Sequence, residues 1–230
     1  MATQLKQSEV LATRDEAVHL IAHRGFWTKP EDKNSMRAFR AALENGYGIE
    51  TDVRDLKGEL VISHDMPKGC EDTLEAFLEL YCEIGNRTTL AINIKSDGLA
   101  EPVKQLLDQY AVENYFCFDM SIPDMMGYFR NGATVFARRS EYEPTSIATE
   151  KANGIWLDAF EGHWFDSQEW DSWLRCGKDV CVVSPELHKR DRVDLWRQIH
   201  TYCQEESGES STSRRGRLML CTDFPHEFWG

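Results

Sequence analysis

Eight short apolar or β-branched runs recur along the 230 residues of the chain, and this repetition limits the folds that it can adopt. Segments in which apolar residues recur at helical spacing separate most of the runs. Strands that alternate with helices predict a parallel sheet with crossover helices. Eight such units predict an α/β fold, a single-domain (β/α)8 TIM barrel, over residues 1–230. The expected strands are Val18–Ala22, Tyr47–Val53, Thr89–Ile94, Tyr115–Phe118, Thr134–Ala137, Gly154–Leu157, Asp179–Val183 and Leu218–Cys221. The clearest expected helices are Ser35–Glu44, Leu74–Leu80, Leu99–Tyr110 and Val193–Tyr202.

The two ends of the chain predict an irregular barrel. Gly230 follows soon after the eighth run, so we expect no eighth C-terminal helix. A helix around Ser8–Ala17 is expected to cover the gap that this leaves. The segment 204–216 is rich in Ser, Glu, Gly and Thr, which predicts a mobile loop.

Charge and cysteine usage restrict the partners and the compartment. The formal net charge of −13 disfavours binding to nucleic acid and to anionic membranes. The basic cluster Arg214, Arg215 and Arg217 is typical of a solvated loop. No run of about 18 apolar residues exists, so no membrane span is expected. Seven cysteines without a CxxC pair, and a polar start from Met1 to Val10, favour a reduced chain in the cytoplasm.

Polar side chains stand at or just beyond the end of every expected strand. Because catalytic residues of such barrels come from the carboxyl ends of several strands, this pattern predicts one site at the barrel mouth. Asp119, Asp158 and Glu186 are expected as further contacts at this rim. The complete set is His23, Glu50, Asp52, Asn93, Lys95, Asp119, Arg138, Arg139, Asp158, Ser184, Glu186, Thr222 and Asp223.

Three strings near the start of the chain carry the chemistry. His23-Arg24-Gly25, Glu50-Thr51-Asp52 and His64-Asp65 supply two imidazoles and two alternate carboxylates. Alternation places Glu50 and Asp52 on one strand face, and Thr51 on the other. Two histidines can act as an acid and a base, while two carboxylates can hold a hard divalent cation. This combination suits cleavage of a phosphodiester.

These strings, together with the segment 34–39 (Asn34-Ser35-x-x-Ala38-Phe39), resemble the glycerophosphodiester phosphodiesterase family, with a more distant similarity to spider-venom phospholipase D. Thr222-Asp223-x-Pro225 is similar to the family's final strand. The resemblance implies a TIM barrel in which His23 and His64 are the catalytic acid–base pair. It also implies that Glu50 and Asp52 hold Mg²⁺ or Ca²⁺.

The resemblance extends to the phosphate, with Lys95 and Arg24 expected as its ligands. Three departures stand beside it. The family's third acidic metal ligand is replaced by Asn93, which can ligate through its amide oxygen but brings no charge. Lys33 replaces a helix-opening glutamate. Only 24 residues separate Asp65 from Thr89, which predicts a reduced insertion between the second and third strands and a more open pocket.

The leading hypothesis is a metal-dependent phosphodiester hydrolase for glycerophosphodiester-like small substrates, with His64 favoured as the acid. Two alternatives stay open. One is a barrel that has lost turnover and binds a phosphorylated sugar or lipid head group, which Asn93 favours. The other is an isomerase or aldolase using Lys95. The segment Ser184–His188 is expected to form a proline-fixed turn. The sequence sets neither the substrate's alcohol groups nor an oligomeric state.

Overall fold

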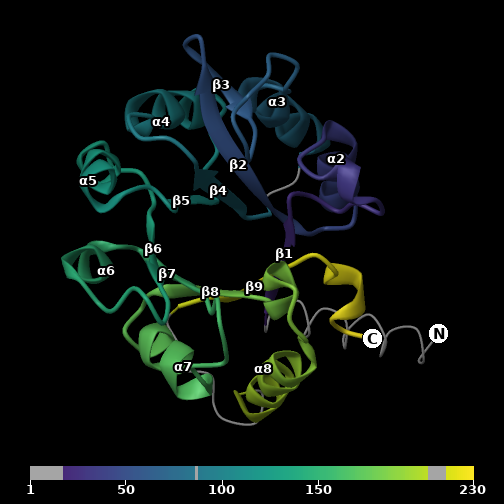
Figure 1. Cartoon of the computed structure of the whole chain (residues 1–230), viewed down its shortest axis with the longest axis vertical. Helices are drawn as coiled ribbons and strands as arrows, with labels where there is room; N and C mark the ends of the chain where they lie inside the picture. Colours follow the sequence, from purple (N-terminus) through teal and green to yellow (C-terminus); the bar gives the residue numbers. More distant parts are fainter. Residues whose placement is uncertain (1–17, 86–87, 207–215) are drawn as a thin grey trace.

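A computed structural model describes residues 18–85, 88–206 and 216–230 of the chain. Eight parallel strands form a nearly closed barrel, which Figure 1 shows from one end. The strands follow the order β5-β4-β2-β1-β9-β8-β7-β6 around it. They are β1 (His19–His23), β2 (Gly48–Leu56), β4 (Leu90–Ile94), β5 (Tyr115–Phe118), β6 (Phe136–Arg139), β7 (Gly154–Leu157), β8 (Asp179–Val183) and β9 (Leu218–Thr222). The prediction of a (β/α)8 TIM barrel is confirmed.

A short hairpin was not predicted from the sequence. Strand β3 (Glu59–Ile62) pairs antiparallel with the far end of β2. It contains only four residues, and only the last two are buried, so its pattern carries little strand signal. The hairpin extends from the barrel wall beyond the neighbouring strand ends (Figure 1).

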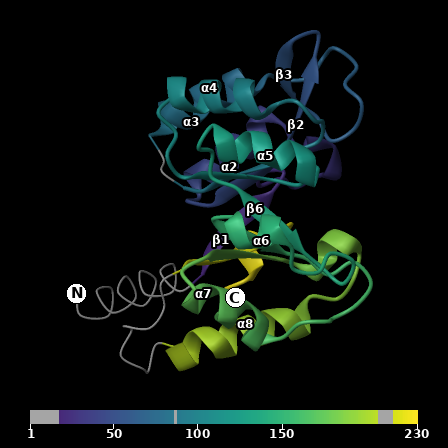
Figure 2. The same ribbon diagram turned by 90° about the vertical axis from the view of Figure 1, so that its left-hand side faces the viewer.

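Seven α-helices among the described residues surround the barrel, as Figures 1 and 2 show. Four of them begin with a side-chain cap, because Ser35, Thr73, Ser121 and Asp166 each accept a hydrogen bond from a backbone N–H in the first turn. The helices are α2 (Met36–Glu44), α3 (Leu74–Ile84), α4 (Ala100–Gln109), α5 (Ile122–Arg130), α6 (Ile147–Lys151), α7 (Ser167–Arg175) and α8 (Val193–Glu206). None of the described helices is long and apolar enough to cross a membrane.

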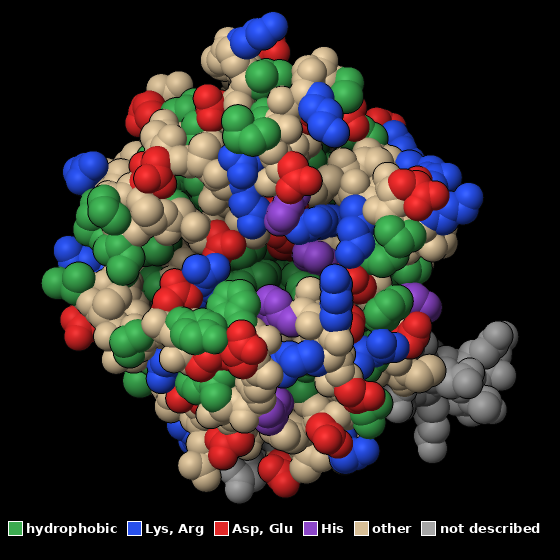
Figure 3. All heavy atoms as spheres, in the orientation of Figure 1, with side chains coloured by type: hydrophobic (Ala, Val, Ile, Leu, Met, Phe, Trp, Pro, Cys, Tyr) green, Lys and Arg blue, Asp and Glu red, His purple; other side chains and the backbone are tan. Residues whose placement is uncertain are grey.

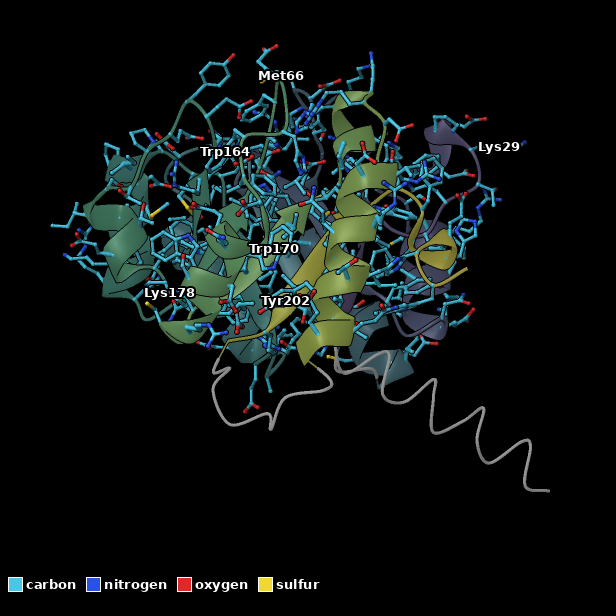
Figure 4. All side chains as sticks on the ribbon, turned by 90° about the horizontal axis from the view of Figure 1, so that it is seen from below. Lys29, Met66, Trp164, Trp170, Lys178 and Tyr202 are labelled. Carbon is cyan, nitrogen blue, oxygen red and sulfur yellow. The ribbon has the colours of Figure 1, made fainter. Side chains whose placement is uncertain are left out.

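The core consists of an outer layer and a barrel interior. In the outer layer, Trp170 of α7 lies edge-to-face against Tyr202 of α8, with ring centroids 5.9 Å apart (Figure 4). In the interior, Phe116 stacks on Phe136 at 3.8 Å, and Phe118 stacks on Trp156 at 3.9 Å. Trp156 is therefore a core residue of the barrel.

Large interior rings stabilise the weakest seam of the barrel. Strands β5 and β6 pair only through a bridge between Cys117 and Val135, beside a hydrogen bond from the Cys117 N–H to the Thr134 carbonyl. Phe116 lies on β5 and Phe136 on β6, so their stack joins the two strands where backbone pairing is sparse.

The described residues 223–230, which follow β9, contain no α-helix. The 3-10 helix η3 (Pro225–Glu227) comes next, and Phe228 packs edge-to-face on Trp196 of α8. The expected helix Ser8–Ala17 lies outside the described residues. So do residues 207–215 of the expected loop 204–216, including Arg214 and Arg215.

The described edges of that expected loop are structured. Helix α8 continues to Glu206, and Arg217 pairs with Asp179 at 2.7 Å. Arg217 is 45% exposed in its side chain, as expected for a solvated residue, and its guanidinium also ties the start of β9 to β8. The segment 185–188 forms the expected proline-led turn, the 3-10 helix η2 (Pro185–His188).

We expect Phe136→Ala to lower the free energy of unfolding by about 3 kcal/mol or more, because it leaves a cavity at the β5–β6 seam. The matched control is Ile147→Ala, at a position 63% exposed, which is expected to cost less than about 0.5 kcal/mol. Urea unfolding of both variants measures the difference. Equal effects would contradict the role of the stacked rings.

Candidate active site

Charged side chains and histidines surround a central hollow on the face shown in Figure 3. The pairing of the parallel strands explains part of this convergence. His23 of β1 pairs in register with Glu50 of β2, and Asp52 of β2 pairs with Asn93 of β4. Strand register therefore brings four of the predicted residues together at one end of the barrel.

Two buried carboxylates form the centre of the site. Glu50 is 1% exposed and Asp52 is fully buried. Asp52 accepts a hydrogen bond of 2.8 Å from the Asn34 amide, and the Nε atom of Arg24 lies 3.0 Å from its Oδ2 atom. The Lys95 ammonium lies 3.4 Å from its Oδ1 atom. Burial and the nearby charge of Asp52 raise the pKa of Glu50 to about 8.

Three oxygen-bearing side chains fit a hard divalent cation. The Asn93 amide donates to the Oε1 atom of Glu50 at 3.2 Å. The Oδ1 atoms of Asp52 and Asn93 are buried and accept no hydrogen bond from the described residues. Carboxylate and amide oxygens are the ligands that Mg²⁺ and Ca²⁺ prefer, and a cation would satisfy both of these acceptors. No three His, Cys, Asp or Glu side chains converge in the described part of the chain, so the third donor of this set is an amide.

His23 is held by a carboxylate from the last strand. Its Nδ1 atom lies 2.7 Å from the Oδ1 atom of Asp223, and its Nε2 atom lies 3.9 Å from Glu50. Burial lowers the pKa of His23 and outweighs the opposing effect of Asp223. The imidazole is therefore neutral at neutral pH. With Nδ1–H donating to Asp223, Nε2 keeps a lone pair that can accept a proton.

Asp223 has a second partner in Lys33, whose ammonium lies 3.1 Å from its Oδ2 atom. Burial acts to raise the pKa of Asp223, but the hydrogen bond with His23 and the charges of His23 and Lys33 hold it below its usual value. Lys33 thus places a cation next to the histidine–carboxylate pair.

The turn after β1 explains the string His23-Arg24-Gly25. Arg24 and Gly25 both have positive φ angles, 58° and 86°. A Cβ atom on Gly25 would lie 2.8 Å from the backbone of Ala38, so only glycine fits. The turn directs the Arg24 N–H to the Glu50 carbonyl at 2.9 Å and its side chain to Asp52.

His64 lies apart from this cluster. It follows the β2–β3 hairpin, is 46% exposed in its side chain, and pairs through Nδ1 with Asp65 at 2.8 Å. The neighbouring Met66 lies at the outer edge of the molecule in Figure 4. Within the described residues, no hydrogen bond or ion pair joins His64 to His23 or Glu50. The hydrogen bond and the charge of His64 lower the pKa of Asp65, and the charge of Arg24 contributes less.

The other predicted rim residues continue around the mouth. Lys95 also lies 3.6 Å from Asp119, which pairs with Arg138 at 2.8 Å. Asp158 pairs with His188 at 2.7 Å. Glu186 accepts hydrogen bonds from Ser184, Thr222 and the N–H of Asp223. Its carboxylate thus helps to fix the position of Asp223, which pairs with His23.

Sequence reasoning gave no specific role to three residues of this network. Asp223 orients His23, Asn34 binds both Asp52 and Thr51, and His188 pairs with Asp158. Asn34 and Asp223 each lie in a string that resembles the family, which is the signal that could have found them.

No family model and no curated protein sequence matches the chain. Solved structures do resemble it. A provisionally assigned glycerophosphodiester phosphodiesterase from Galdieria sulphuraria matches with a TM-score of 0.71 and 17% identity, over 92% of this chain and 96% of that one. The glycerophosphodiester phosphodiesterase from Agrobacterium tumefaciens matches with a TM-score of 0.62 and 18% identity, over 93% and 100%.

A Ca²⁺-dependent phosphatidylinositol-specific phospholipase C from Streptomyces antibioticus matches more weakly. Its TM-score is 0.56 and its identity 10%, over 93% of this chain and 96% of that one. At such identities the likeness shows the barrel fold. The fold is thus shared with the family whose motifs the sequence resembles.

In a chelating buffer, the free energy of unfolding should fall as the pH rises from about 6.5 to about 8. Over this interval the folded protein keeps a proton on Glu50 that the unfolded chain has released, so rising pH favours the unfolded chain until that proton dissociates near pH 8. Below about pH 6.5 the lowered pKa of His23 acts in the opposite direction. Urea unfolding of wild type and Glu50→Gln at matched pH isolates Glu50. Parallel curves for the two proteins would contradict the raised pKa.

Proposed function

We propose that the chain is a divalent-cation-dependent phosphodiester hydrolase that acts on small, glycerophosphodiester-like substrates. One observation carries this proposal. A neutral imidazole, oriented by Asp223, lies beside a buried set of oxygen donors from Glu50, Asp52 and Asn93. Together these groups can bind a hard cation and remove a proton next to it.

The comparisons support the same reaction class. Two matching structures are named as glycerophosphodiester phosphodiesterases. A phosphodiesterase from Oleispira antarctica, at 15% identity and a TM-score of 0.61, was solved with the product sn-glycerol-3-phosphate. The phospholipase C from Streptomyces antibioticus is described as Ca²⁺-dependent. We therefore infer a small phosphodiester as substrate and Mg²⁺ or Ca²⁺ as cofactor.

The carboxylates of Glu50 and Asp52 and the amide oxygen of Asn93 would hold the ion. When bound, it supplies positive charge that offsets the charge building up on the phosphoryl oxygens. Arg24 and Lys95 stand on the Asp52 side of the same centre and provide two further cations for the phosphate. The substrate's phosphate is thus expected to lie over Asp52, between these two side chains.

His23 acts as the general base in this proposal. Its Nε2 atom takes a proton from the nucleophile, which is water or a neighbouring hydroxyl of the substrate. The second route gives a cyclic phosphate first. Asp223 keeps Nδ1 protonated and stabilises the imidazolium that forms. His64, which follows the β2–β3 hairpin, donates a proton to the departing alcohol oxygen.

The alternatives make different use of the same residues. Asn93 lowers the negative charge of the cation site, which favours a barrel that binds a phosphorylated ligand without turnover. The isomerase or aldolase alternative requires an available Lys95 amine, whereas Lys95 lies between the carboxylates of Asp52 and Asp119.

We place the protein in the cytoplasm because all seven cysteines are free thiols.

The acid–base roles predict that His23→Ala and His64→Ala each lower kcat on bis(p-nitrophenyl) phosphate about 100-fold or more in the presence of Mg²⁺ or Ca²⁺. Asp223→Asn should lower kcat with little effect on KM, because it removes the partner that fixes the tautomer of His23. His163→Ala is the control, since that imidazole contacts Gln198 instead. Full turnover in His64→Ala would remove His64 from the mechanism. Absence of turnover in the wild type would favour the binding-only barrel.

The cation site predicts a binding difference that does not depend on activity. Glu50→Gln and Asp52→Asn should weaken binding of Mg²⁺ or Ca²⁺ about tenfold or more, because each removes one of the two charged donors. Asp55→Asn is the matched control, since Asp55 lies on the same strand, is exposed and accepts a hydrogen bond from Ser96. Isothermal titration calorimetry measures the three dissociation constants. Equal affinities in all variants would exclude this site.

A further inference from the structure

His23 lies between two carboxylates, and the carboxylate that its ring proton faces sets which nitrogen is free. Its Nδ1 atom lies 2.7 Å from Asp223, and its Nε2 atom lies 3.9 Å from Glu50. A neutral imidazole carries one ring proton, so only one of its nitrogens can donate to a carboxylate. Nε2 can accept a proton only while the ring proton stays on Nδ1 and faces Asp223. The position of the Asp223 carboxylate therefore selects the tautomer of His23.

Lys33 contacts both oxygens of the Asp223 carboxylate. Its ammonium lies 3.1 Å from Oδ2 and 3.3 Å from Oδ1, which is the oxygen that also faces His23. Two contacts restrict the rotation of the carboxylate, whereas Glu186 binds only the backbone N–H of Asp223. The Asp223 side chain is 11% exposed, so an oxygen without a partner is unfavourable. Without Lys33, we expect the carboxylate to turn toward water and to loosen its contact with His23.

Trp27 connects Lys33 with the backbone of His23. The Lys33 ammonium lies 4.3 Å from the centroid of the Trp27 ring, where cation–π attraction holds it. The indole N–H of Trp27 donates to the His23 carbonyl at 3.0 Å. The Trp27 ring also lies 6.5 Å from the ring of Phe224, which follows Asp223 in the chain. These contacts form a closed circuit that begins at the backbone of His23 and returns to its ring.

The backbone around Lys33 is fixed against the turn that follows β1. Lys33 comes directly after the 3-10 helix η1 (Pro30–Asp32). The next residue, Asn34, has a φ angle of 58°, and its N–H donates to the Arg24 carbonyl at 2.9 Å. The Asn34 amide donates to Asp52. Two adjacent residues thus contact the two parts of the proposed site, Asn34 at the cation donors and Lys33 at the partner of the base.

We propose that Lys33 is a positioning residue. It fixes the Asp223 carboxylate against Nδ1 of His23, which leaves Nε2 free to accept a proton. Trp27 holds the Lys33 ammonium in the position that this requires. This inference rests on the proposed function for the use of that proton acceptor. The competing role is direct contact of Lys33 with the phosphate, because its side chain is 24% exposed.

The first experiment measures the tautomer of His23 without substrate. Nitrogen-15 NMR of the full chain at neutral pH distinguishes a protonated Nδ1 from a protonated Nε2, and His23→Gln assigns the signals. We expect only the Nδ1–H form in the wild type, and about a tenth or more of the Nε2–H form in Lys33→Met. Lys33→Arg should keep the Nδ1–H form, because a guanidinium can also contact both carboxylate oxygens. Lys29→Met is the matched control, since Lys29 lies in the same loop and is exposed at the edge of the molecule in Figure 4.

The second experiment separates positioning from phosphate binding. Lys33→Met should lower kcat on bis(p-nitrophenyl) phosphate about tenfold or more, while KM and the calorimetric affinity for inorganic phosphate stay within about twofold. Lys33→Arg should keep kcat within about threefold of the wild type. Trp27→Phe keeps a ring beneath the ammonium, so it should lower kcat less than Trp27→Leu. Near-ultraviolet circular dichroism confirms that the variants are folded, and Lys33→Gln, which also lacks the charge, replaces Lys33→Met if that variant does not fold.

Two results would overturn the positioning role. One is an unchanged tautomer of His23 in Lys33→Met. The other is a rise in KM with a matching loss of phosphate affinity, which would make Lys33 a phosphate ligand. The NMR readout separates this inference from the hydrolase proposal. If the wild type cleaves no phosphodiester but Lys33→Met still changes the tautomer, the positioning role stands and the proposed reaction falls.

Discussion

The buried carboxylate pair of Glu50 and Asp52 is the constraint on which the site depends. Two acids without exposure at the end of one strand are unfavourable unless positive charge and hydrogen-bond donors surround them. Arg24 and Lys95 provide the charge around Asp52, and Asn34 and Asn93 provide donors. Glu50 receives less positive charge and fewer hydrogen bonds than Asp52, so burial and the charge of Asp52 raise its pKa. A divalent cation bound as proposed would supply the missing charge.

The sequence predicted the strands and the cluster around β2 because both depend on local pattern. Apolar runs mark buried strands, and alternation places Glu50 and Asp52 on one face. Parallel pairing then brings His23 and Asn93 to their sides, as the barrel hypothesis implied. The short hairpin strand β3 was not predicted, because four residues are too few to show a clear periodicity.

Long-range partners could not be predicted in the same way. The bond between His23 and Asp223 joins residues 200 positions apart, and that between Asp158 and His188 joins residues 30 positions apart. Such pairs depend on barrel closure, on loop conformation and on side-chain rotamers, none of which has a signature in the local sequence. The exposed position of His64 likewise depends on the β2–β3 hairpin, whose existence the sequence did not indicate.

The rim divides the chemistry between two halves of the barrel. The half formed by β1, β2, β4 and β9 carries the proposed cation donors, the two cations proposed to bind the phosphate and the His23–Asp223 pair. The half formed by β6, β7 and β8 carries Arg138 and the Asp158–His188 pair, over interior rings that also close the β5–β6 seam. Lys95 and Asp119 link the halves on one side, and Glu186 links them on the other. The two groups of side chains thus lie on different strands of one continuous sheet, so a substitution at the Asp158–His188 pair can leave the side chains around Asp52 in place, while Glu186 is the route by which it can reach Asp223.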